Sequence, residues 1–341
     1  MSLKKILIIQ TAFIGDVVLA TSLIKQTKEL FTDSTIDFLL RKGNQSLLKE
    51  NPNIRNIICW DKKKGKYKNL LLLAINARKE QYDIVLNIQR FTSSGIFLLI
   101  CGAKNKVGFD KNPLSYFFHH RIKHQIPHID PSGEILHEVQ RNSLLLSPFR
   151  KQNEKPQLIR PEIFFSQEEN RKVSTIQERA LDKEYLVIAP SSVWFTKQWH
   201  KDKWIELCQK LDYKYHIFLI GGPDDSKYVE SISNHIENKT NLCGELTLTE
   251  SALLMRRAKR VFVNDSAPLH LASSVNAPTT AIFCSTVKSF GYFPLSEESK
   301  LFQVNEDLAC RPCGLHGKKQ CPLGHFKCSM LIDVNDVISG L

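Results

Sequence analysis

The sequence predicts an α/β protein with two Rossmann-like, doubly wound domains, and three observations support this class. The chain has 341 residues, which exceeds the usual limit for a single hydrophobic core. Short apolar runs alternate with helical patterns in two series, as in parallel sheets covered by helices on both faces. A polar segment with two prolines, residues 147–160, separates the series. We therefore expect domains at 1–155 and 156–341, and the terminal helix can pack back on the first.

The first series begins with a buried strand at residues 4–10, a loop at 11–16 and a helix at 17–30. Later strands are expected at 35–40, 54–60, 83–88 and 106–109, and helices near 45–50, 70–79, 95–101 and 137–146. Residues 110–135 hold four histidines and three prolines at spacings that fit no metal site. We expect a solvated loop there.

The second series has expected strands at 185–189, 216–220, 261–263 and 279–283, the last of which closes the series. Helices are expected at 201–211, 228–236, around 253–258, and from about residue 335. Ligands of such sheets bind outside the carboxyl ends of the strands, so we expect a cleft between the domains. The absence of GxGxxG after the first strand and of GxxxxGK[ST] disfavours a nicotinamide dehydrogenase and a P-loop NTPase.

The net charge of +12 lies entirely in residues 1–155, where 25 Lys and Arg stand against 13 Asp and Glu. This excess indicates nucleic acid, an anionic membrane surface or an acidic substrate as partner, or only a soluble basic surface. No apolar run approaches the ~20 residues that a membrane span needs. Gln10 and Asp16 interrupt the N-terminal run, which favours a strand over a signal peptide and predicts a cytoplasmic protein.

A strand-to-helix corner at residues 261–272 organises the second domain. Asn264, Asp265 and Ser266 offer N-cap chemistry, and Pro268 suits a first helical turn. Free backbone N–H groups at such a corner can hold an anion, often a phosphate, and we expect His270 to project toward it. The alternative is a well-capped structural helix.

Two further loops offer polar groups to the expected cleft. Asp16 follows the first strand, where it is either a helix cap or a general base that accepts a proton from an attacking hydroxyl. The loop after residue 189 carries the hydroxyls of Ser191, Ser192 and Thr196, and Lys197 supplies a compact charge suited to phosphate. Packing of its tryptophans is the alternative role for this loop.

A cysteine-rich segment precedes the C-terminus. Cys310, Cys313, Cys321 and Cys328 lie within 19 residues, with His316 and His325 between them. This spacing makes them weak candidates for a zinc site, because the second half is loose. A compact loop of buried thiols is the favoured alternative, and we expect neither a metal nor a cofactor.

Taken together, five stretches resemble the lipopolysaccharide heptosyltransferases of glycosyltransferase family nine. They read ILIIQTAFIGDVVLATSLI, IAPSSVWFTKQWHKDKW, FLIGGPDD, VNDSAPLHLASSVNAPTTAIF and CRPCGLHGKKQCPLGHFKCSM. The last is similar to the heptosyltransferase II branch. The resemblance implies a GT-B fold, whose two domains face a central cleft, ADP-heptose as donor and inversion at the anomeric carbon.

The resemblance also implies roles for individual residues. Asp16 matches the catalytic base and Lys197 the donor-phosphate lysine. Asp265, Ser266 and His270 match the ADP-binding segment, in which Ala267 replaces the usual glycine and narrows the approach to a phosphate. Asp224 or Asp225 matches the residue that contacts the donor ribose. His137 and Arg141 match the residues that face the acidic acceptor, and we expect Arg90 to bind the acceptor as well.

These roles predict heptose transfer to the anionic lipid A–Kdo–heptose core, with peripheral contact at the inner face of the inner membrane. The lysine-rich stretch 62–68 is expected at that surface. One alternative is a GT-B enzyme that uses another nucleotide sugar. A less favoured alternative is a zinc-containing protein that binds nucleic acid through the basic half. For the favoured function we expect no nucleic-acid partner.

Overall fold

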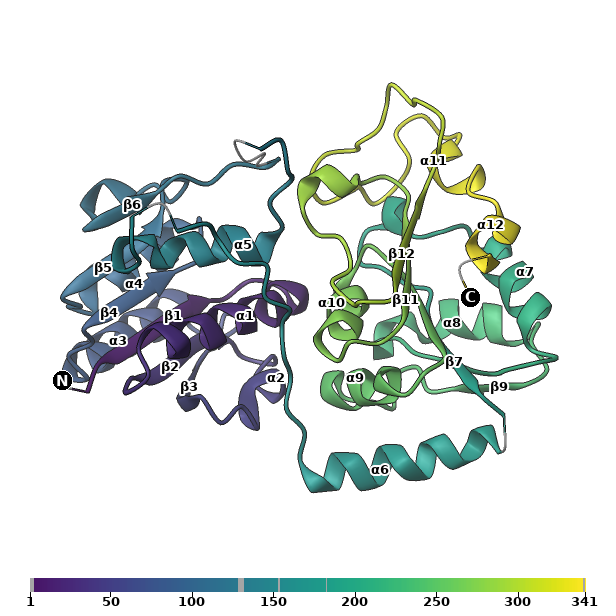
Figure 1. Ribbon diagram of the computed structural model, residues 1–341, viewed down its shortest axis with the longest axis horizontal. Coiled ribbons are helices and arrows are strands. Elements are labelled where there is room, and N and C mark those ends of the chain that lie inside the picture. The colour runs from purple at the N-terminus through teal and green to yellow at the C-terminus, as the bar shows by residue number, and fades with distance from the viewer. Residues whose placement is uncertain (1–2, 128–131, 153, 182, 340) are drawn as a thin grey trace. The chain divides into compact units, whose positions relative to one another are not determined.

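The computed structural model describes residues 3–127, 132–152, 154–181, 183–339 and 341. The chain forms two compact units, Met1–Phe164 and Phe165–Leu341, each with its own sheet and core (Figure 1). The division expected from the sequence, after residue 155, falls in the irregular segment that ends the first unit.

The first unit contains a six-stranded parallel sheet in the order β3-β2-β1-β4-β5-β6. Ile6, Leu7, Ile8 and Ile9 of the central strand are fully buried, because helices cover both faces of the sheet. The strands are β1 (Lys5–Gln10), β2 (Thr35–Arg41), β3 (Ile54–Trp60), β4 (Ile84–Asn87), β5 (Asn105–Phe109) and β6 (His120–Ile122).

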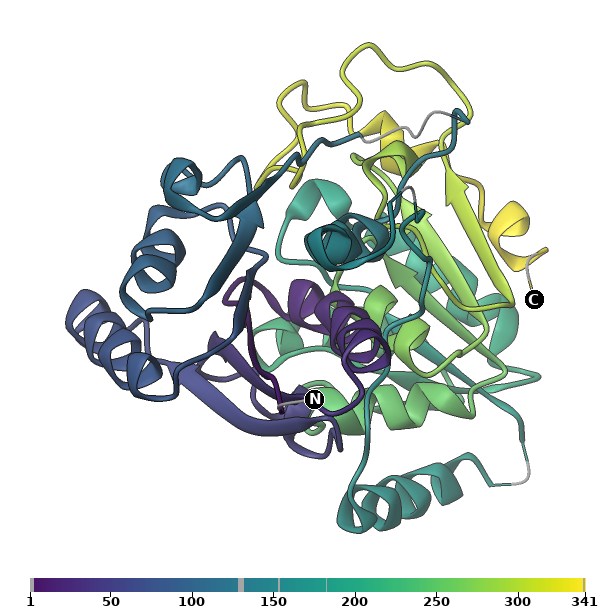
Figure 2. The same ribbon diagram turned by 60° about the vertical axis from the view of Figure 1, so that its left-hand side comes forward.

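Helices form two layers around this sheet. One face is covered by α3 (Lys66–Lys79) and α4 (Thr92–Ile100), which share a core with β1 and β4. On the other face α1 (Ile14–Leu30) packs beside α5 (Glu138–Ser143) (Figure 2). The short α2 (Ser46–Lys49) lies between β2 and β3 in the chain.

The second unit repeats this plan, with a parallel sheet in the order β12-β11-β10-β7-β8-β9. Its strands are β7 (Tyr185–Ala189), β8 (His216–Leu219), β9 (Lys239–Asn241), β10 (Arg260–Asn264), β11 (Thr279–Phe283) and β12 (Ser299–Gln303). Its helices are α6 (Gln167–Gln177), α7 (Lys201–Leu211), α8 (Ser226–Ser233), α9 (Leu248–Arg256), α10 (Ala267–Ser274), α11 (Lys327–Met330) and α12 (Val334–Ile338).

The predicted α/β class with two parallel sheets is confirmed. Three edge strands, β6, β9 and β12, and the helices α6 and α11 were not predicted, and β12 rather than β11 closes the second sheet. The sequence does not predict these edge strands because they are short or half-exposed and lack a continuous apolar run. Part of the stretch 110–135, expected to be a loop, forms β6 and a 3₁₀ turn at Ser115–Phe117.

Two helix positions refine the predictions. Helix α1 begins at Ile14 rather than at residue 17, so the expected loop is shorter and Asp16 lies inside the helix. Helix α12 packs on α7 through Val334 and Val337, which belong to the core of the second unit. In the described ranges no helix is both long and apolar enough to cross a membrane.

Candidate active site

Asp16 is the third residue of α1, directly after the turn that leaves β1. Its Oδ2 accepts a hydrogen bond from the backbone N–H of Phe13, 3.2 Å away, which explains the early start of the helix. A carboxylate is favoured in this first turn by the helix dipole. The residue is half-buried, at a position where its carboxylate also serves the helix end.

Side chains from neighbouring strand ends hold the turn that carries Asp16. The ammonium of Lys62 donates to the backbone oxygen of Thr11 at 2.7 Å and lies 4.6 Å from the ring centroid of Trp60. Burial lowers the pKa of Lys62 to about 8. Gln89 donates to the amide oxygen of Gln10, which also accepts from the Ala12 N–H at 3.2 Å. No spacing pattern in the sequence predicts these contacts, because they join three separate strand ends.

The three predicted acceptor residues differ in accessibility. Arg90 is exposed, and its guanidinium lies 5.5 Å from the ring centroid of Phe91. His137 and Arg141 are fully buried. The helix expected from residue 137 begins at Glu138, because His137 is the N-cap of α5 and its Nδ1 accepts from the Val139 N–H at 3.2 Å.

Arg141 has strong partners inside the first unit. Its Nε donates to Glu138 Oε2 at 2.8 Å and its Nη1 to the backbone oxygen of Leu136 at 2.6 Å. Charge-assisted bonds of this kind fix a buried guanidinium firmly. In this structure Arg141 therefore organises the start of α5.

In the second unit, Asn264 at the end of β10 clamps the loop that follows β7. Its Nδ2 donates to the Pro190 oxygen at 2.8 Å, and its Oδ1 accepts from the Trp199 N–H at 2.9 Å. The amide is completely buried, so both contacts are shielded from water. Asn264 thus fixes both ends of the predicted phosphate loop instead of capping α10.

The loop hydroxyls are not equally available. Ser191 and Thr196 are buried, and Thr196 Oγ1 accepts from the Lys318 N–H at 2.8 Å. Ser192 is half-buried, and its hydroxyl accepts a long bond, 3.4 Å, from the Trp194 N–H. Of the three predicted hydroxyls, Ser192 is the one that a ligand can reach without displacing the loop.

Lys197, Asp265 and Thr286 form a compact cluster at the carboxyl ends of the central strands. The Lys197 ammonium lies 2.7 Å from Asp265 Oδ2, which also accepts from the Thr286 hydroxyl at 2.6 Å. The Lys197 side chain is only 15% exposed. Two predicted donor residues are therefore in direct contact, while Thr286, far along the chain, was missed.

Helix α10 begins beside this cluster. Ser266 is its N-cap by position, but its side chain makes no capping hydrogen bond, so the predicted capping is wrong. An N-terminus without a side-chain cap keeps its first-turn N–H groups available to an anion. Ala267 is the first helical residue, and this conformation suits alanine, so the backbone here does not require the usual glycine.

His270 lies one turn into α10 and is buried. Burial lowers its pKa to about 4, against the opposing influence of the Asp265 carboxylate, so the ring is neutral at pH 7. Its Nδ1 has no hydrogen-bond partner among the described residues. A buried polar atom without a partner, beside a lysine and an open helix end, is the feature of this site that most directly indicates a ligand.

The two aspartates proposed for the donor ribose lie in the turn after β8 and differ in their contacts. Asp225 Oδ2 accepts from the Gly222 N–H at 2.9 Å and so stabilises the turn. Asp224 is exposed. The carboxylate of Asp224 is the more accessible of the two.

The cysteine-rich segment forms a loop against the donor cluster. Cys310, Cys313, Cys321 and Cys328 line one cavity of about 420 Å³ together with His325, and all four are free thiols. His325 Nε2 lies 4.0 Å from the sulfur of Cys310. In the described ranges no three His, Cys, Asp or Glu side chains are arranged to hold a metal ion.

This loop supports the predicted phosphate lysine. Arg311 donates to the backbone oxygens of Cys284 at 2.7 Å and Thr286 at 2.5 Å. A Cβ added at Gly317, whose φ is +76°, would lie 3.0 Å from Thr196 Oγ1 and 3.2 Å from Lys197 Cγ. The close approach explains why a glycine stands there. The sequence draws attention to this segment through its cysteines. In the structure, Arg311 and Gly317 make the contacts between this segment and the site.

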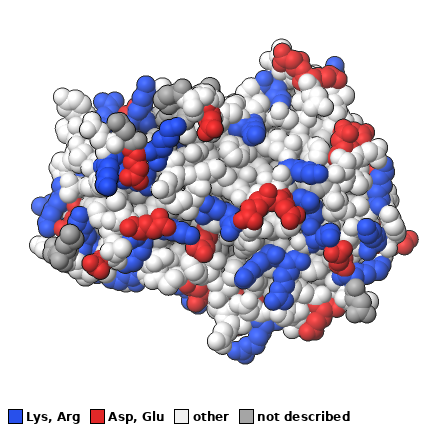
Figure 3. All heavy atoms as spheres, in the orientation of Figure 1, with Lys and Arg blue, Asp and Glu red and all other residues white. Residues whose placement is uncertain are grey.

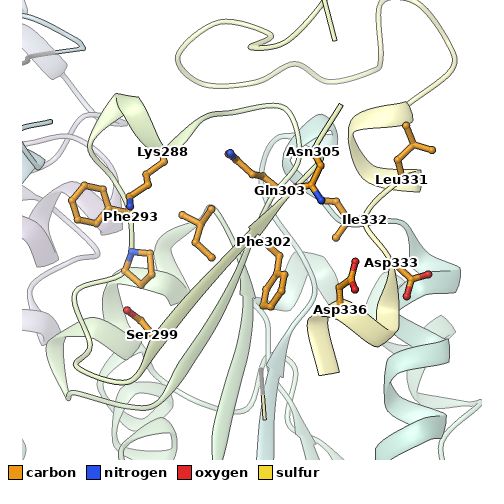
Figure 4. A pocket seen from close by; sticks show the side chains of 12 residues that line it. Lys288, Phe293, Ser299, Phe302, Gln303, Asn305, Leu331, Ile332, Asp333 and Asp336 are labelled. Atoms are coloured by element: carbon orange, nitrogen blue, oxygen red, sulfur yellow. The ribbon is translucent and has the colours of Figure 1, made fainter. Parts of the chain in front are cut away.

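A second hollow of about 460 Å³ runs along the edge strand β12 (Figure 4). Lys288, Phe302, Asp333 and Asp336 are among the side chains around it. None of the predicted site residues lines it. This hollow is therefore separate from the residues that the sequence predicts for the site.

Comparison with known proteins gives one family. Residues 72–326 match the profile of glycosyltransferase family 9 (heptosyltransferase). Lipopolysaccharide heptosyltransferase 3 of Escherichia coli strain K12 is 28% identical over 287 residues, 80% of this chain and 80% of that protein. Lipooligosaccharide heptosyltransferase 2 of Campylobacter jejuni subsp. jejuni is 26% identical over 332 residues, 95% of this chain and 93% of that protein.

Solved structures extend the likeness to the fold. The ADP-heptose lipopolysaccharide heptosyltransferase II of E. coli has a TM-score of 0.78 at 18% identity, covering 98% of this chain and 97% of that chain. A family 9 glycosyltransferase from Veillonella parvula has a TM-score of 0.83 at 19% identity, covering 100% and 97%. These matches confirm the predicted GT-B fold class.

The buried histidine predicts a pH-dependent stability. Because the pKa of His270 is about 4 in the folded chain and ordinarily 6.5, the unfolded chain takes up a proton first as the pH falls. Stability is therefore retained above pH 6.5 and lost progressively toward pH 4. Between pH 7 and 5 the wild type should lose about 2 kcal/mol more unfolding free energy than His270→Gln, measured by urea denaturation. Identical losses in both proteins would contradict the assignment.

The Asn264 clamp predicts a large loss of stability. Asn264→Ala leaves a buried N–H and a buried carbonyl without partners, at a cost of roughly 2 kcal/mol or more in unfolding free energy. Ser192→Ala, which removes one long hydrogen bond from the same loop, is the matched control and should change stability by less than about 0.5 kcal/mol. Thermal unfolding of the three proteins measures this difference, and equal stabilities would exclude the clamp.

Proposed function

The chain belongs to glycosyltransferase family 9, the heptosyltransferases, and on that premise we propose that it transfers a heptose from ADP-heptose to the lipopolysaccharide core. The proposed acceptor is the anionic inner core, lipid A–Kdo–heptose, and the transfer inverts the anomeric carbon. The observation that carries this proposal is the neutral, unpartnered His270 Nδ1 next to the Lys197–Asp265 pair at the open end of α10.

The second unit offers these groups to the donor diphosphate. Lys197 supplies a full positive charge, and the start of α10 adds backbone N–H groups and the positive end of the helix dipole. His270 adds a hydrogen-bonding ring nitrogen that stays uncharged at pH 7. Asp265, held by Thr286, keeps Lys197 in place. Ser191, Ser192, Thr196 and Asp224 complete the proposed donor site, in which Ser192 and Asp224 are the accessible members.

The first unit supplies the proposed base. Asp16 removes the proton from the acceptor hydroxyl as that oxygen attacks the anomeric carbon. The bond from this carbon to the ADP oxygen breaks with its electron pair, and the departing phosphate charge is stabilised by Lys197 and α10. Attack opposite the leaving group accounts for inversion. The reaction requires Asp16 and the donor site to meet on one substrate.

The acceptor role rests on charge and on Arg90. Residues 1–155 carry the whole net charge of +12, which suits an anionic sugar core, and Arg90 presents an exposed guanidinium. His137 and Arg141 are fully buried, so an acceptor could touch them only after they become exposed. Because the proposed acceptor is a lipid, we place the reaction at the cytoplasmic face of the inner membrane, with the protein as a peripheral partner.

A second candidate is a GT-B enzyme that uses a different nucleotide sugar. Ala267 favours it, because its methyl group stands at the first turn of α10, where the resemblance to the family implies a glycine. ADP and UDP distinguish the candidates in a thermal-shift assay, because a ligand that binds the folded state raises its melting temperature. Selective stabilisation by ADP supports the first candidate, and selective stabilisation by UDP supports the second.

Replacing the proposed base should separate chemistry from binding. Asp16→Asn keeps the shape but loses the proton acceptor, so turnover should fall by roughly 10²–10⁴-fold. Affinity for ADP should be unchanged, because the proposed nucleotide site lies in the other unit. Near-normal turnover of Asp16→Asn with ADP-heptose would refute the role.

Replacing the phosphate lysine should have the opposite effect on binding. Lys197→Met removes the charge closest to the proposed diphosphate and should weaken ADP at least about tenfold, since hydrogen bonds to charged groups contribute about 1.5–3 kcal/mol. Lys201→Met, on the exposed start of α7, is the matched control and should bind ADP normally. Calorimetric titration measures both, and equal affinities would remove Lys197 from the donor site.

A further inference from the structure

Helix α3 exposes large apolar side chains on the side opposite its buried stripe. Leu70, Ala74 and Ala77 face the core of the first unit. Leu71, Leu72 and Ile75 are 47%, 50% and 43% exposed, although they lie within little more than one turn of each other. A surface helix normally presents polar residues there, so this outer stripe requires an explanation.

Basic residues frame the stripe at both ends. Lys68 precedes Leu72 by four positions, and Lys79 follows Ile75 by four, so both lie on the apolar side of the helix. Residues 61–79 contain seven Lys and Arg and one acidic residue, Asp61, whose carboxylate lies 3.2 Å from the Lys42 ammonium. The helix itself contains no Asp or Glu.

The neighbouring helix continues the apolar surface. Helix α4 packs beside α3 on the same face of the sheet, as Figure 2 shows, and has no charged residue. Its outward Ile96 is 39% exposed and the preceding Phe91 is 50% exposed. We call the surface formed by these apolar side chains and the exposed lysines nearby the α3–α4 face: Leu71, Leu72, Ile75, Phe91, Ile96, Lys63, Lys64, Lys66, Lys68 and Lys79.

We propose that the α3–α4 face seats the protein on an anionic lipid bilayer. Apolar side chains at the level of the acyl boundary, with lysines at the level of the headgroups, are the pattern of an interfacial helix. Each lysine near an anionic leaflet adds attraction. The second unit has no net charge, so the whole basic excess belongs to the first unit. In the view of Figure 3, Lys and Arg are interspersed with Asp and Glu.

The choice of a bilayer rests partly on the proposed function, whose acceptor is a lipid. One contact links the face to that chemistry: Lys62, just before α3, donates to the Thr11 oxygen at 2.7 Å in the turn that carries Asp16. A bilayer held by α3 therefore lies near the turn that bears the proposed base. A lipid-linked sugar would reach this turn without leaving the membrane.

Vesicle flotation of the purified protein tests the proposal without donor or acceptor. Vesicles of phosphatidylcholine with about a third phosphatidylglycerol should carry the wild type, and pure phosphatidylcholine or high salt should release it. Lys64→Gln/Lys66→Gln/Lys68→Gln should weaken binding by about a hundredfold. Leu71→Gln/Leu72→Gln/Ile75→Gln should weaken it by at least about tenfold, because the apolar contact is lost.

Matched controls replace equally exposed residues elsewhere. Leu3→Gln/Leu158→Gln/Leu181→Gln and Lys201→Gln/Lys227→Gln/Lys319→Gln should float like the wild type. The proposal is overturned if the wild type does not bind anionic vesicles, or if control and test variants lose binding equally. It is also overturned if Leu71→Gln/Leu72→Gln/Ile75→Gln converts a dimer to a monomer without changing vesicle binding, because the face would then bind a second copy of the chain. Because flotation needs no sugar transfer, a wrong donor or acceptor would leave this result intact.

Discussion

The ion pair between Lys197 and Asp265 is the interaction on which the second unit's site depends. The two groups are 2.7 Å apart and largely withdrawn from water, so each would be costly to bury without the other. Their surroundings supply the geometry that such a pair needs. Asn264 fixes the loop of Lys197 to β10, and Thr286 donates to Asp265 from the segment after β11. A phosphate that reaches this position finds its cation already oriented.

The cysteine-rich loop also helps to hold the Lys197–Asp265 pair. Arg311 binds the segment after β11 through backbone oxygens, and Gly317 permits the loop to approach Thr196 and Lys197 closely. The loop therefore excludes water on one side of the cluster, which strengthens its electrostatic interactions. Asp16 in the first unit is positioned by different means. A hydrogen bond from the Phe13 N–H and its place in the first turn of α1 hold its carboxylate, and the residue is half-buried.

The sequence predicted the fold class because both sheets contain continuous apolar strands, such as 6–9 and 186–189, that have no other stable location. It predicted which strand ends carry chemistry, since parallel strands end at one edge. It could not predict Thr286, Asn264 as a clamp, or Lys62 against Thr11, because these contacts join segments far apart in the chain. It also could not show that His137 and Arg141 are buried at the start of α5, where local hydrogen bonds hold both side chains.

The central claim is that a heptose leaves ADP and joins an anionic lipopolysaccharide core. Mass spectrometry of products formed by the purified protein, with ADP-heptose and a core acceptor truncated before the added sugar, tests it most directly. The expected product is an acceptor that has gained one heptose, with stoichiometric release of ADP. An unchanged acceptor with ADP-heptose, together with a glycosylated product from a UDP- or GDP-linked sugar, would contradict it.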